Sequence, residues 1–393
     1  MKILFLSLRF PYPPHRGDRI RAYHFIKQLA KRHSVTVVSF VESDEEIANV
    51  KHLEAFCDRV KWVRFRRNQA RLNVLLHCFS NQPLQLHYWY AKEMQRTINK
   101  LLENTDFELM QVQFFRMAQY VAHLQTPRKV LDLGDSMALN LSRRVALDRS
   151  IKRPLIKLEE RRVRQYEVEI TRSFDWGTVV SPFDRDYLFK QDDTLKLSVV
   201  PMGVDLEYFQ PTSSEYKPYL LFTGTMSYFP NWDAALYFYR EIFPLVQAKH
   251  PETTFYIVGN HPASQIQQLA NQENVVVTGR VPDTRPYFEE AAVFVSPLRS
   301  GSGMQAKNLE AMAMGIPVVT TSIGALGLNA KAGQELLIAD TPEAFAKHVI
   351  HLIENRDFRQ SVGSAGRKLV EAKYDWQVLV QGLEEIYSQI LTT

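Results

Sequence analysis

Cysteine is scarce in this chain of 393 residues, and long hydrophobic runs are missing. The two cysteines, Cys57 and Cys78, are too few for a disulfide framework or a cysteine metal cage, and they fit a reducing cytoplasm. No apolar run approaches the ~20 residues that a membrane span needs. The opening MKILFLSLRF is followed by Pro11, Pro13 and Pro14 instead of a cleavage site. We therefore expect neither an exported nor a membrane-spanning protein.

A dinucleotide fingerprint is missing as well. The turn after the first apolar run, LRFPYPPHRGD, contains no Gly-x-Gly-x-x-Gly, and no acidic residue follows in that context at a spacing of ~20 residues. This argues against a nicotinamide-dependent oxidoreductase. One acidic pair, Asp184 and Asp186, has the Asp-x-Asp spacing of a metal site, but it follows an expected strand where a helix begins. We expect these acids to cap that helix, and we expect no metal site and no cofactor.

Acidic residues are in short supply in the first half of the chain. Residues 1–200 hold 34 Lys and Arg against 23 Asp and Glu, a balance of +11, whereas residues 201–393 hold 14 against 20, a balance of −6; together these give the net +5. A strongly basic half suits a polyanionic surface such as an anionic bilayer.

Two segments of the basic half combine the charge with large apolar groups. Residues 59–79 place Trp62, Phe65 and Leu72 among arginines, and both a solvated helix face and an interfacial membrane contact remain open for them. For residues 143–167 we favour a solvated helix face.

Short apolar runs recur along the whole chain, separated by segments of helical periodicity. Their continuous hydrophobicity is typical of parallel strands with helices on both faces of the sheet. The expected strands are residues 2–8, 34–40, 60–65, 107–113, 129–133, 176–181, 197–204, 219–225, 254–260, 274–281, 293–298, 316–321 and 335–339. Thirteen strands are too many for one sheet. The sequence therefore predicts an α/β protein with two doubly wound, Rossmann-like domains and a ligand cleft between the carboxyl ends of their strands.

The expected domain boundaries follow from breaks in this pattern. Residues 205–220 interrupt it with Pro211 and Pro218, and a helical stretch breaks near Tyr374-Asp375-Trp376. We expect an N-terminal domain over residues 1–205, a C-terminal domain over residues 206–375 and a closing helix over residues 376–393. That helix packs either on its own domain or back on the first, and the sequence leaves both open.

Residues 293–321, VFVSPLRSGSGMQAKNLEAMAMGIPVVTT, predict a strand, a glycine turn, a helix and a second strand. The unpaired backbone N–H groups at a helix start are a natural seat for a phosphate or diphosphate, which Gly301 and Gly303 allow the backbone to approach. Lys307 can add a positive charge to the same anion. Glu310 lies three residues further, on the same helix face, where its carboxylate can accept two hydrogen bonds from a ribose diol.

Other glycine loops follow expected strands of the same domain. They contain Gly224, Gly259, Gly279 and Arg280. Because the carboxyl ends of parallel strands converge at one edge of a sheet, we expect these residues to lie beside the glycine turn of residues 301–303. Arg280 can pair with a diphosphate. An ordinary glycine loop in a buried crossover is the competing interpretation, and the number of such loops favours a ligand site.

These motifs resemble the donor half of glycosyltransferase family 4, the retaining enzymes of GT-B fold. The resemblance rests on GxGMQxKNLEAMAMGIPVV, FTGTMSYFPNWDAAL and VPMGVDLEYFQP. The first forty residues are similar to the sugar-transferase branch associated with bacterial exopolysaccharide and PEP-CTERM exosortase loci. The resemblance covers essentially the whole chain. It implies a nucleotide-sugar donor on the C-terminal domain, an acceptor on the N-terminal domain, retention of anomeric configuration and no obligatory metal.

The resemblance also assigns individual residues. Glu310 corresponds to the second glutamate of the family's Glu-x7-Glu motif, which holds the nucleotide ribose. Met304 and Gln305 fall with Gly303 in the loop that meets the diphosphate or the donor sugar. In the N-terminal domain, Gly17 would contact the donor phosphate. Asp18 and Arg19 would face donor or acceptor.

Another expected strand end of the N-terminal domain, VLDLGDSMALN, places Asp132, Asp135 and Ser136 toward the cleft, the last two on the acceptor side. Asp135 either orients an acceptor hydroxyl or caps the following helix, and both interpretations stay open.

The chain departs from the family pattern at two places. The first glutamate of the motif, which touches the donor sugar, is replaced by Ser302, and the usual Arg/Lys pair is missing from GTMSYFPNWDA. We expect Arg280 and Lys307 to supply the lost positive charge. These two residues and Asp135 are the expected catalytic residues. Ser302 marks a position where sugar specificity differs from that of commoner relatives.

We therefore expect a hexosyltransferase-type glycosyltransferase that transfers a sugar to a glycan, lipid-linked or small-molecule acceptor. The alternatives are a GT-B epimerase or phosphorylase-like enzyme, or a non-catalytic nucleotide-sugar-binding protein. The expected location is the cytoplasm or the inner face of the plasma membrane, with an anionic membrane surface and no nucleic acid as partner.

Overall fold

The computed structural model describes residues 1–148, 150–211, 217–301 and 303–392. It divides into two compact units: unit 1 comprises Met1–Pro201 and Leu379–Thr393, and unit 2 comprises Met202–Val378. Each unit is built around one parallel sheet with helices on both faces. The sequence placed the boundaries at residues 205/206 and 375/376.

Unit 1 contains a seven-stranded sheet in the order β3-β2-β1-β4-β5-β6-β7. Its strands are β1 (Lys2–Ser7), β2 (Ser34–Val41), β3 (Arg59–Arg64), β4 (Leu109–Gln113), β5 (Arg128–Gly134), β6 (Trp176–Val179) and β7 (Leu197–Val199). In the central register, Leu4 lies opposite both Thr36 and Met110. The order reverses direction next to β1, so the loops after β1 and β4 diverge to opposite faces and leave space at that edge.

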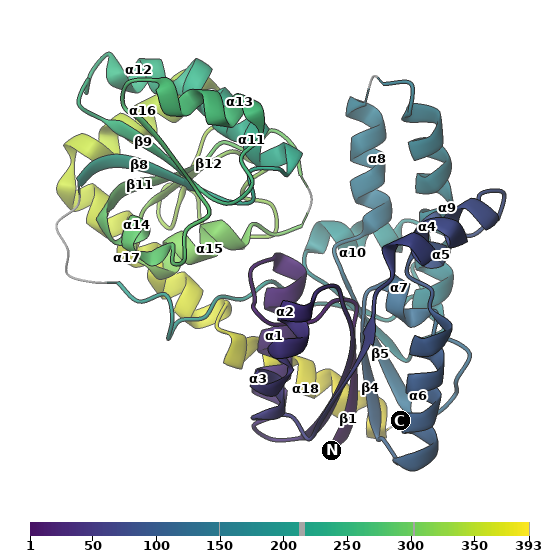
Figure 1. The fold of residues 1–393 in the computed structure, drawn as a ribbon. Coiled ribbons are helices and arrows are strands. Elements are labelled where there is room, and N and C mark those ends of the chain that lie inside the picture. Colours follow the sequence, from purple (N-terminus) through teal and green to yellow (C-terminus); the bar gives the residue numbers. More distant parts are fainter. Residues whose placement is uncertain (149, 212–216, 302, 393) are drawn as a thin grey trace. The chain divides into compact units, whose positions relative to one another are not determined.

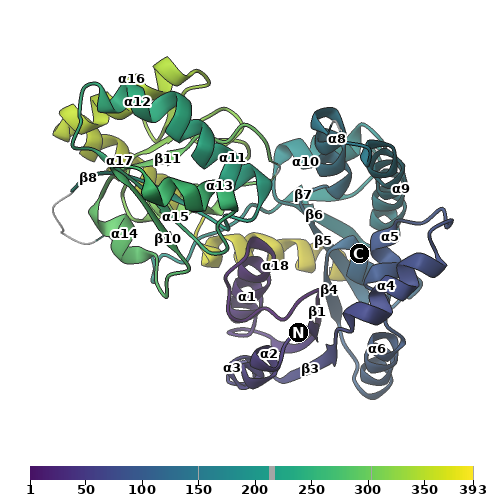
Figure 2. The same ribbon diagram turned by 45° about the horizontal axis from the view of Figure 1, so that its top comes forward.

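Helices cover both faces of the unit 1 sheet. They are α1 (Gly17–Leu29), α2 (Asp44–Ala48), α3 (Val50–Glu54), α4 (Arg67–Leu76), α5 (Leu84–Tyr88), α6 (Lys92–Asn104), α7 (Phe115–Ala118), α8 (Met137–Leu147), α9 (Arg153–Arg172), α10 (Pro182–Phe189) and α18 (Trp376–Thr392). Helices α1 to α3 lie on one face together with α18, and α4 to α7 lie with α9 on the other (Figures 1 and 2).

The last helix, α18, settles the alternative that the sequence left open. From Leu379 onward it belongs to unit 1. The Tyr387 hydroxyl donates to Oε1 of Gln111 in β4 over 2.8 Å, and both side chains are buried. Glu384 accepts from Arg32 and pairs with His33 at the end of α1. The chain therefore starts and finishes in the same unit.

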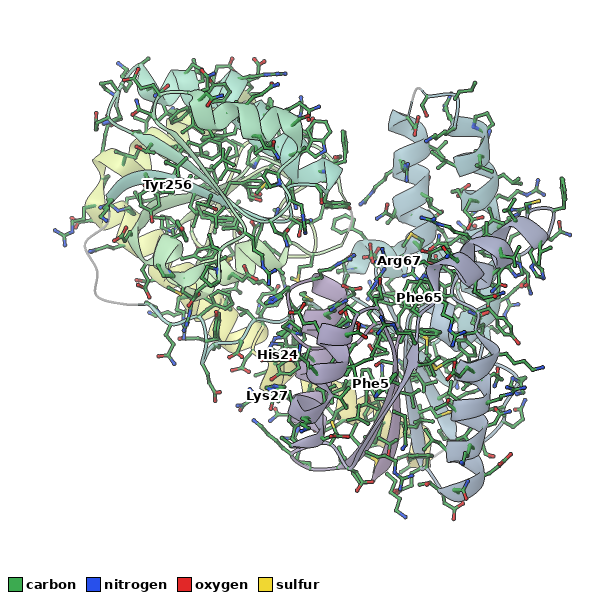
Figure 3. All side chains as sticks on the ribbon, viewed as in Figure 1. Phe5, His24, Lys27, Phe65, Arg67 and Tyr256 are labelled. Carbon is green, nitrogen blue, oxygen red and sulfur yellow. The ribbon has the colours of Figure 1, made fainter. Side chains whose placement is uncertain are left out.

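The core of unit 1 lies on both faces of its central strands. Phe5 of β1 is 1% exposed and lies inside the sheet (Figure 3). Leu4 and Leu6 belong to the cluster under α6, α7 and α9. Successive β1 residues point to opposite faces, so an uninterrupted apolar strand is buried on both sides, as the sequence predicted.

Unit 2 contains a six-stranded parallel sheet in the order β10-β9-β8-β11-β12-β13. Its strands are β8 (Lys217–Thr223), β9 (Thr254–Val258), β10 (Val275–Gly279), β11 (Ala291–Ser296), β12 (Val318–Thr320) and β13 (Leu337–Ile338). The order again reverses beside the first strand. The edge beside β8 and β11 is therefore where a ligand of unit 2 is expected.

The helical elements of unit 2 form two layers. They are α11 (Phe229–Tyr237), the π-helix η1 (Phe238–Ile242), α12 (Phe243–Gln247), α13 (Ser264–Gln267), the 3-10 helix η2 (Gln268–Asn271), α14 (Arg285–Glu290), α15 (Ala306–Ala313), α16 (Pro342–Glu354) and α17 (Arg356–Lys373). Helices α11 to α13 share one face with α16, and α14, α15 and α17 lie on the other (Figure 1). Gly363 of α17 packs closely against the loop between α15 and β12. A Cβ added to Gly363 would be 2.0 Å from the carbonyl oxygen of Gly315 in that loop.

The predicted fold class is confirmed. All thirteen expected strands are present in the described part of the chain, and they divide into two parallel sheets at the predicted interruption. Within the same described ranges, no helix has the length and apolar content needed to cross a membrane.

Candidate functional site

The loops after β8 and β9 meet through two glycines. An added Cβ on Gly259 would lie 1.7 Å from the carbonyl oxygen of Gly224, and the Gly224 N–H donates to the Val258 carbonyl over 3.0 Å. Their φ angles are +156° and +158°, which L side chains rarely adopt. At the carboxyl edge of the sheet, where the sequence placed the donor, Gly259 is therefore required by close backbone contact and Gly224 by the side chain of Asn231, 2.7 Å from an added Cβ.

Lys307, in the first turn of α15, reaches the same edge. Its Nζ donates to Oδ1 of Asn231 over 2.5 Å and lies 4.5 Å from the centre of the Phe222 ring in β8. Asn231 is 7% exposed, and its Nδ2 donates to the Thr225 carbonyl. The Lys307 ammonium is thus held in place by a neutral amide and an aromatic face, and no carboxylate among the described residues lies within ion-pair distance of it.

Glu310 lies one helical turn after Lys307, as the spacing predicted. Burial raises the pKa of the Glu310 carboxyl, and the positive charge of Lys307 opposes that rise. Burial lowers the pKa of the Lys307 ammonium, and Glu310 opposes that lowering in turn. Both side chains are half-buried. Within the described ranges, no protein group donates a hydrogen bond to the Glu310 carboxylate. Its oxygens are therefore available to accept hydrogen bonds from a hydroxylated ligand.

The helix that carries both residues begins later than expected. The sequence opened it at Gly303, whereas α15 begins at Ala306 and is preceded by Gln305, whose side chain makes no capping bond. Gly303 has φ +68° and Gly301 has φ +134°, so the turn before the helix adopts conformations that favour glycine. Met304 and Gln305 are half-buried in this turn. Ser302 lies outside the described residues.

The next strand end, after β10, carries the predicted Arg280. Gly279 has φ +67°, and a Cβ added there would meet nothing within 4 Å. Arg280 is exposed. The other arginine of this edge, Arg299, pairs with Asp233 over 2.6 Å and lies over the ring of Tyr237. Arg280 thus remains the predicted diphosphate partner, and Arg299 is held by the protein itself.

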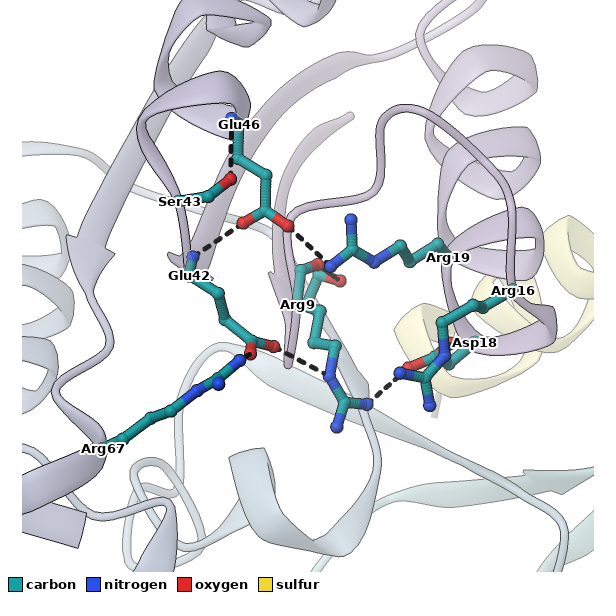
Figure 4. Close-up of polar contacts among 9 residues, drawn as sticks. Arg9, Arg16, Asp18, Arg19, Glu42, Ser43, Glu46 and Arg67 are labelled. Carbon is teal, nitrogen blue, oxygen red and sulfur yellow. Dashed lines mark hydrogen bonds and ion pairs between the residues drawn. The ribbon is translucent and has the colours of Figure 1, made fainter. Parts of the chain in front are cut away.

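Asp18 and Arg19, which the sequence predicted to face the donor or the acceptor, belong to an ion-pair network in unit 1 (Figure 4). Asp18 pairs with Arg9 over 2.6 Å, Arg9 also pairs with Glu42, and Arg19 pairs with Glu46 over 2.6 Å. Burial favours a higher pKa for Asp18, but Arg9, Arg16 and Arg19 together outweigh burial and hold the pKa of Asp18 below its ordinary value. The charges of Asp18 and Arg19 are therefore already balanced inside the protein.

Gly17 is the first residue of α1. It is exposed, and an added Cβ would meet nothing within 4 Å. The space beside it is compatible with the predicted phosphate contact, but the fold does not require glycine there.

Ser136, rather than Asp135, caps α8. The Ser136 hydroxyl accepts from the Leu139 N–H and donates to Glu167, and the side chain is fully buried. Of the two roles left open for Asp135, helix capping therefore falls to its neighbour. The Ser136 hydroxyl is buried and makes both of these hydrogen bonds within the protein. It would have to give up both bonds to make its predicted contact with an acceptor.

Two carboxylates beneath α8 hold that helix start in place. Glu167 of α9 accepts from the Met137 and Ala138 N–H groups, and Asp184 of α10 accepts from the Ser136 N–H over 2.9 Å. Burial raises the pKa of Glu167 to about 7 against these hydrogen bonds. The expected capping of α10 by Asp184 and Asp186 is wrong, because Ser181 caps that helix and the exposed Asp186 pairs with Arg185. Asp184 lies in the first turn of α10 and supports the start of the neighbouring helix α8.

An ion pair that the sequence did not reveal lies beneath these elements. Arg21 of α1 donates to both carboxylate oxygens of Asp132 over 2.8 and 2.9 Å, and also to the Pro201 carbonyl. Arg21 is 2% exposed and Asp132 1%. The sequence placed Asp132 in the cleft, and that expectation is wrong. The buried fork ties α1 to β5 and to the end of the first sheet.

A cavity of about 440 Å³ in unit 1 was not predicted either. It lies between α4, α5 and α9, and its lining includes Asn73, His77, His87, Tyr90 and Tyr166. None of the residues predicted for the site lines it. The rings of His77 and His87 stack 4.2 Å apart, and the sequence has no motif that signals such a contact between two helices.

Comparison with known proteins adds a family match to this geometry. Residues 217–355, which cover most of unit 2, match the family described as "Glycosyl transferases group 1". The chain is 22% identical over 389 residues to an uncharacterized 44.6 kDa protein in the cps region of Klebsiella pneumoniae, covering 95% of this chain and 96% of that one. It is 32% identical over 126 residues to the capsular polysaccharide biosynthesis glycosyltransferase CapM of Staphylococcus aureus, covering 31% and 33% of the two chains.

Solved structures share the fold over the whole length. The structure of HepE from Anabaena in complex with UDP and glucose has a TM-score of 0.70 and 14% sequence identity, and it covers 99% of each chain. The two parallel sheets, their strand orders and this likeness establish the GT-B fold. With the family match on unit 2, they support one assignment: the chain is a glycosyltransferase of GT-B fold.

Proposed function

We propose that this protein is a retaining glycosyltransferase of family 4. It moves a hexose from a nucleotide-sugar donor to a glycan, lipid-linked or small-molecule acceptor in bacterial polysaccharide or glycoconjugate synthesis. The role of CapM in capsular polysaccharide biosynthesis and the UDP bound to HepE support this proposal. So does the resemblance to the branch found at exopolysaccharide and exosortase loci.

The observation that carries the proposal is Lys307. Its ammonium is half-buried and bonded to the neutral amide of Asn231 instead of a carboxylate. A buried cation without an anionic partner is costly unless an anion binds beside it. A nucleoside diphosphate supplies that anion, and Glu310, one turn further along α15, can accept the ribose hydroxyls.

The same arrangement suggests how transfer is promoted. As the bond between the anomeric carbon and the diphosphate oxygen breaks, negative charge grows on the departing diphosphate. Lys307, Arg280 and the free N–H groups at the start of α15 are the groups that would stabilise it. The acceptor oxygen then bonds to the same carbon from the face that the diphosphate leaves, and the proton of the acceptor hydroxyl passes to the departing diphosphate oxygen. In this scheme positive side chains and backbone dipoles stabilise the leaving group, with no metal or cofactor required.

Donor binding tests the proposal directly. A panel of nucleoside diphosphates and nucleotide sugars should raise the melting temperature, because a ligand that binds only the folded protein stabilises it. We expect Lys307→Met and Glu310→Gln each to weaken binding of the best ligand by roughly tenfold or more, the loss of one charge-assisted contact. Exposed Lys347→Met and Glu273→Gln are matched controls in the same unit and should bind as the wild type does.

Two outcomes would contradict the assignment. One is that no nucleotide in the panel shifts the melting temperature; the other is that neither site variant changes affinity by more than a few-fold.

Incubation with labelled donor and acceptor separates the remaining alternatives. An epimerase alters the donor sugar without transfer, a phosphorylase-like enzyme needs inorganic phosphate, and a binding protein leaves the donor intact.

We also propose that the protein works in the cytoplasm at the inner face of the plasma membrane. Support comes from the +11 balance of residues 1–200, because basic groups near an anionic bilayer each contribute ~1 kcal/mol of attraction. A lipid-linked acceptor would lie at the same surface.

A further inference from the structure

Helix α4 and the loop after it expose large apolar side chains that no neighbouring element covers. Of the ten residues of α4, only Ala70 is buried. Leu75 and Leu76 are each 70% exposed, and Phe79 is 96% exposed. The start of α4 is anchored by Phe65, which precedes the helix by two residues and is buried (Figure 3). The Phe65 ring stacks on Trp89 with ring centres 4.3 Å apart. The apolar side chains are thus presented on a fixed support.

The start of α9 presents a second group of the same kind. Ile151 is 96% exposed, Leu155 57% and Leu158 45%. Leu155 and Leu158 are three residues apart and lie on one side of α9, and Ile151 lies in the turn just before that helix. A solvated helix face, which the sequence favoured for this segment, would carry polar residues at these positions.

Hydrogen bonds bring the two groups to the same side of unit 1. Arg162 of α9 donates to the Cys78 carbonyl over 3.3 Å, and the Glu159 carboxylate accepts from the Leu84 N–H over 3.1 Å. Phe79 directly follows Cys78, and Leu158 directly precedes Glu159. Helices α4, α5 and α9 also lie side by side in both ribbon views (Figures 1 and 2). We call these exposed apolar residues of α4, its following loop and α9 the α4–α9 surface.

Basic residues predominate around the α4–α9 surface, where the acidic residues next to Leu158 are Glu159 and Glu160 of α9. Residues 59–92 contain seven Lys and Arg and no Asp or Glu. Arg66 and Arg71 are exposed, and no acidic residue in the described part of the chain lies within ion-pair distance of either. Beside Ile151 and Leu155, Lys152 and Lys157 are exposed as well.

We propose that the α4–α9 surface docks on an anionic lipid bilayer, its apolar side chains entering the headgroup region and its basic groups pairing with lipid phosphates. Aliphatic side chains ringed by arginine and lysine match such an interface. A nucleic acid would leave the leucines without a stacking partner, and a second copy of the chain would bring like charges together. The inference rests on the proposed membrane location, names the residues that confer it, and makes no use of the donor site.

The test measures binding of the full chain to vesicles. We expect it to float with phosphatidylcholine vesicles that contain about one third phosphatidylglycerol, to bind pure phosphatidylcholine far less, and to be released at high salt. Leu75→Ser with Leu76→Ser and Phe79→Ser should weaken vesicle binding at least about tenfold. Arg66→Glu with Arg71→Glu, and Ile151→Ser with Leu155→Ser, should do the same.

Matched controls keep the result specific. Arg96→Glu with Lys100→Glu makes the same charge change on exposed positions of α6, and Leu245→Ser removes an apolar side chain that is 40% exposed in unit 2. Both should bind vesicles as the wild type does. The nucleotide-induced melting shift should persist in every variant, so loss of vesicle binding would not reflect loss of the donor site.

Three results would overturn the inference. The first is equal binding to neutral and anionic vesicles, and the second is equal loss of binding in the α6 control. The third is a dimer in solution that the Leu75, Leu76 and Phe79 substitutions dissociate, because the surface would then be an interface between copies. If vesicle binding fails while the nucleotide shift persists, only the docking surface is refuted; if the nucleotide shift alone fails, the donor assignment is.

Discussion

The two units use one architecture in opposite ways at the carboxyl edge of the sheet. In unit 1 three arginines near this edge are paired with carboxylates: Arg9 with Asp18, Arg19 with Glu46, and Arg21 with Asp132. In unit 2 glycines directly follow β8 and β9 and end β10, and Lys307 and Glu310 have no protein counter-ion within ion-pair distance in the described ranges.

This difference has a physical meaning. A charge that is already paired in the protein gains little from a ligand, whereas a half-buried charge bonded to a neutral amide gains a strong partner when an anion arrives. Backbone that lacks Cβ atoms can also approach a diphosphate closely. The unit 2 edge is therefore suited to bind a charged ligand, whereas the paired charges of the unit 1 edge are already satisfied within the protein.

Removing one half of the buried ion pair in unit 1 should have the largest effect on stability. Arg21→Ala leaves the Asp132 carboxylate, 1% exposed, with one remaining side-chain donor, Thr178. We expect the free energy of unfolding to fall by about 3–5 kcal/mol, measured by guanidinium denaturation.

The matched control for that substitution is Arg128→Ala, which breaks an Arg–Asp pair in the same unit whose arginine is 44% exposed. An exposed pair of this kind is worth about 0–1 kcal/mol. If Arg21→Ala cost no more than Arg128→Ala, the unit 1 edge would not be held by its internal charges, and the comparison would break.

The acid beneath α8 should make stability depend on pH. Burial raises the pKa of Glu167 from its ordinary value of 4.5 to about 7, so between these values the folded state binds more protons than the unfolded state. The free energy of unfolding should therefore fall as pH rises from about 4.5 to about 7, by about 1–3 kcal/mol in total. Glu167→Gln should flatten this profile in denaturation experiments repeated across that range. Glu169→Gln, an exposed position on the same helix, should keep it, and an unchanged slope in Glu167→Gln would disprove the assignment.

A methyl group on Gly259 should have a smaller effect on stability but a specific one on the donor edge. Gly259→Ala puts a Cβ where the carbonyl of Gly224 lies, so the loops after β8 and β9 must separate. We expect a loss of about 1–3 kcal/mol in unfolding free energy, together with a reduced nucleotide-induced melting shift. The control is Gly382→Ala in α18, where an added Cβ meets nothing within 4 Å and should stabilise by about 0.5–1 kcal/mol. Full nucleotide binding by Gly259→Ala would show that the glycine contact is unrelated to the donor.

Sequence patterns were sufficient for the sheets and for the helix that carries Lys307 and Glu310. Continuous apolar runs gave strands buried on both faces, and the interval of three residues placed the two charged side chains one turn apart. Local patterns were less accurate about the start of α15, which begins at Ala306 instead of Gly303, because several turn conformations can follow the same glycines.

What the sequence by itself determined was the class of fold and the placement of Lys307 and Glu310 one turn apart on a helix, since both depend on spacing along the chain. Only the tertiary structure decided which charges are already paired. Arg21 and Asp132 are separated by 111 residues, and Lys307 and Asn231 by 76, so no local pattern shows that the first pair is satisfied internally or that the lysine has an amide as partner. Pairing and burial arise when distant segments fold together, and they separate the charges that hold this protein together from those left for its ligand.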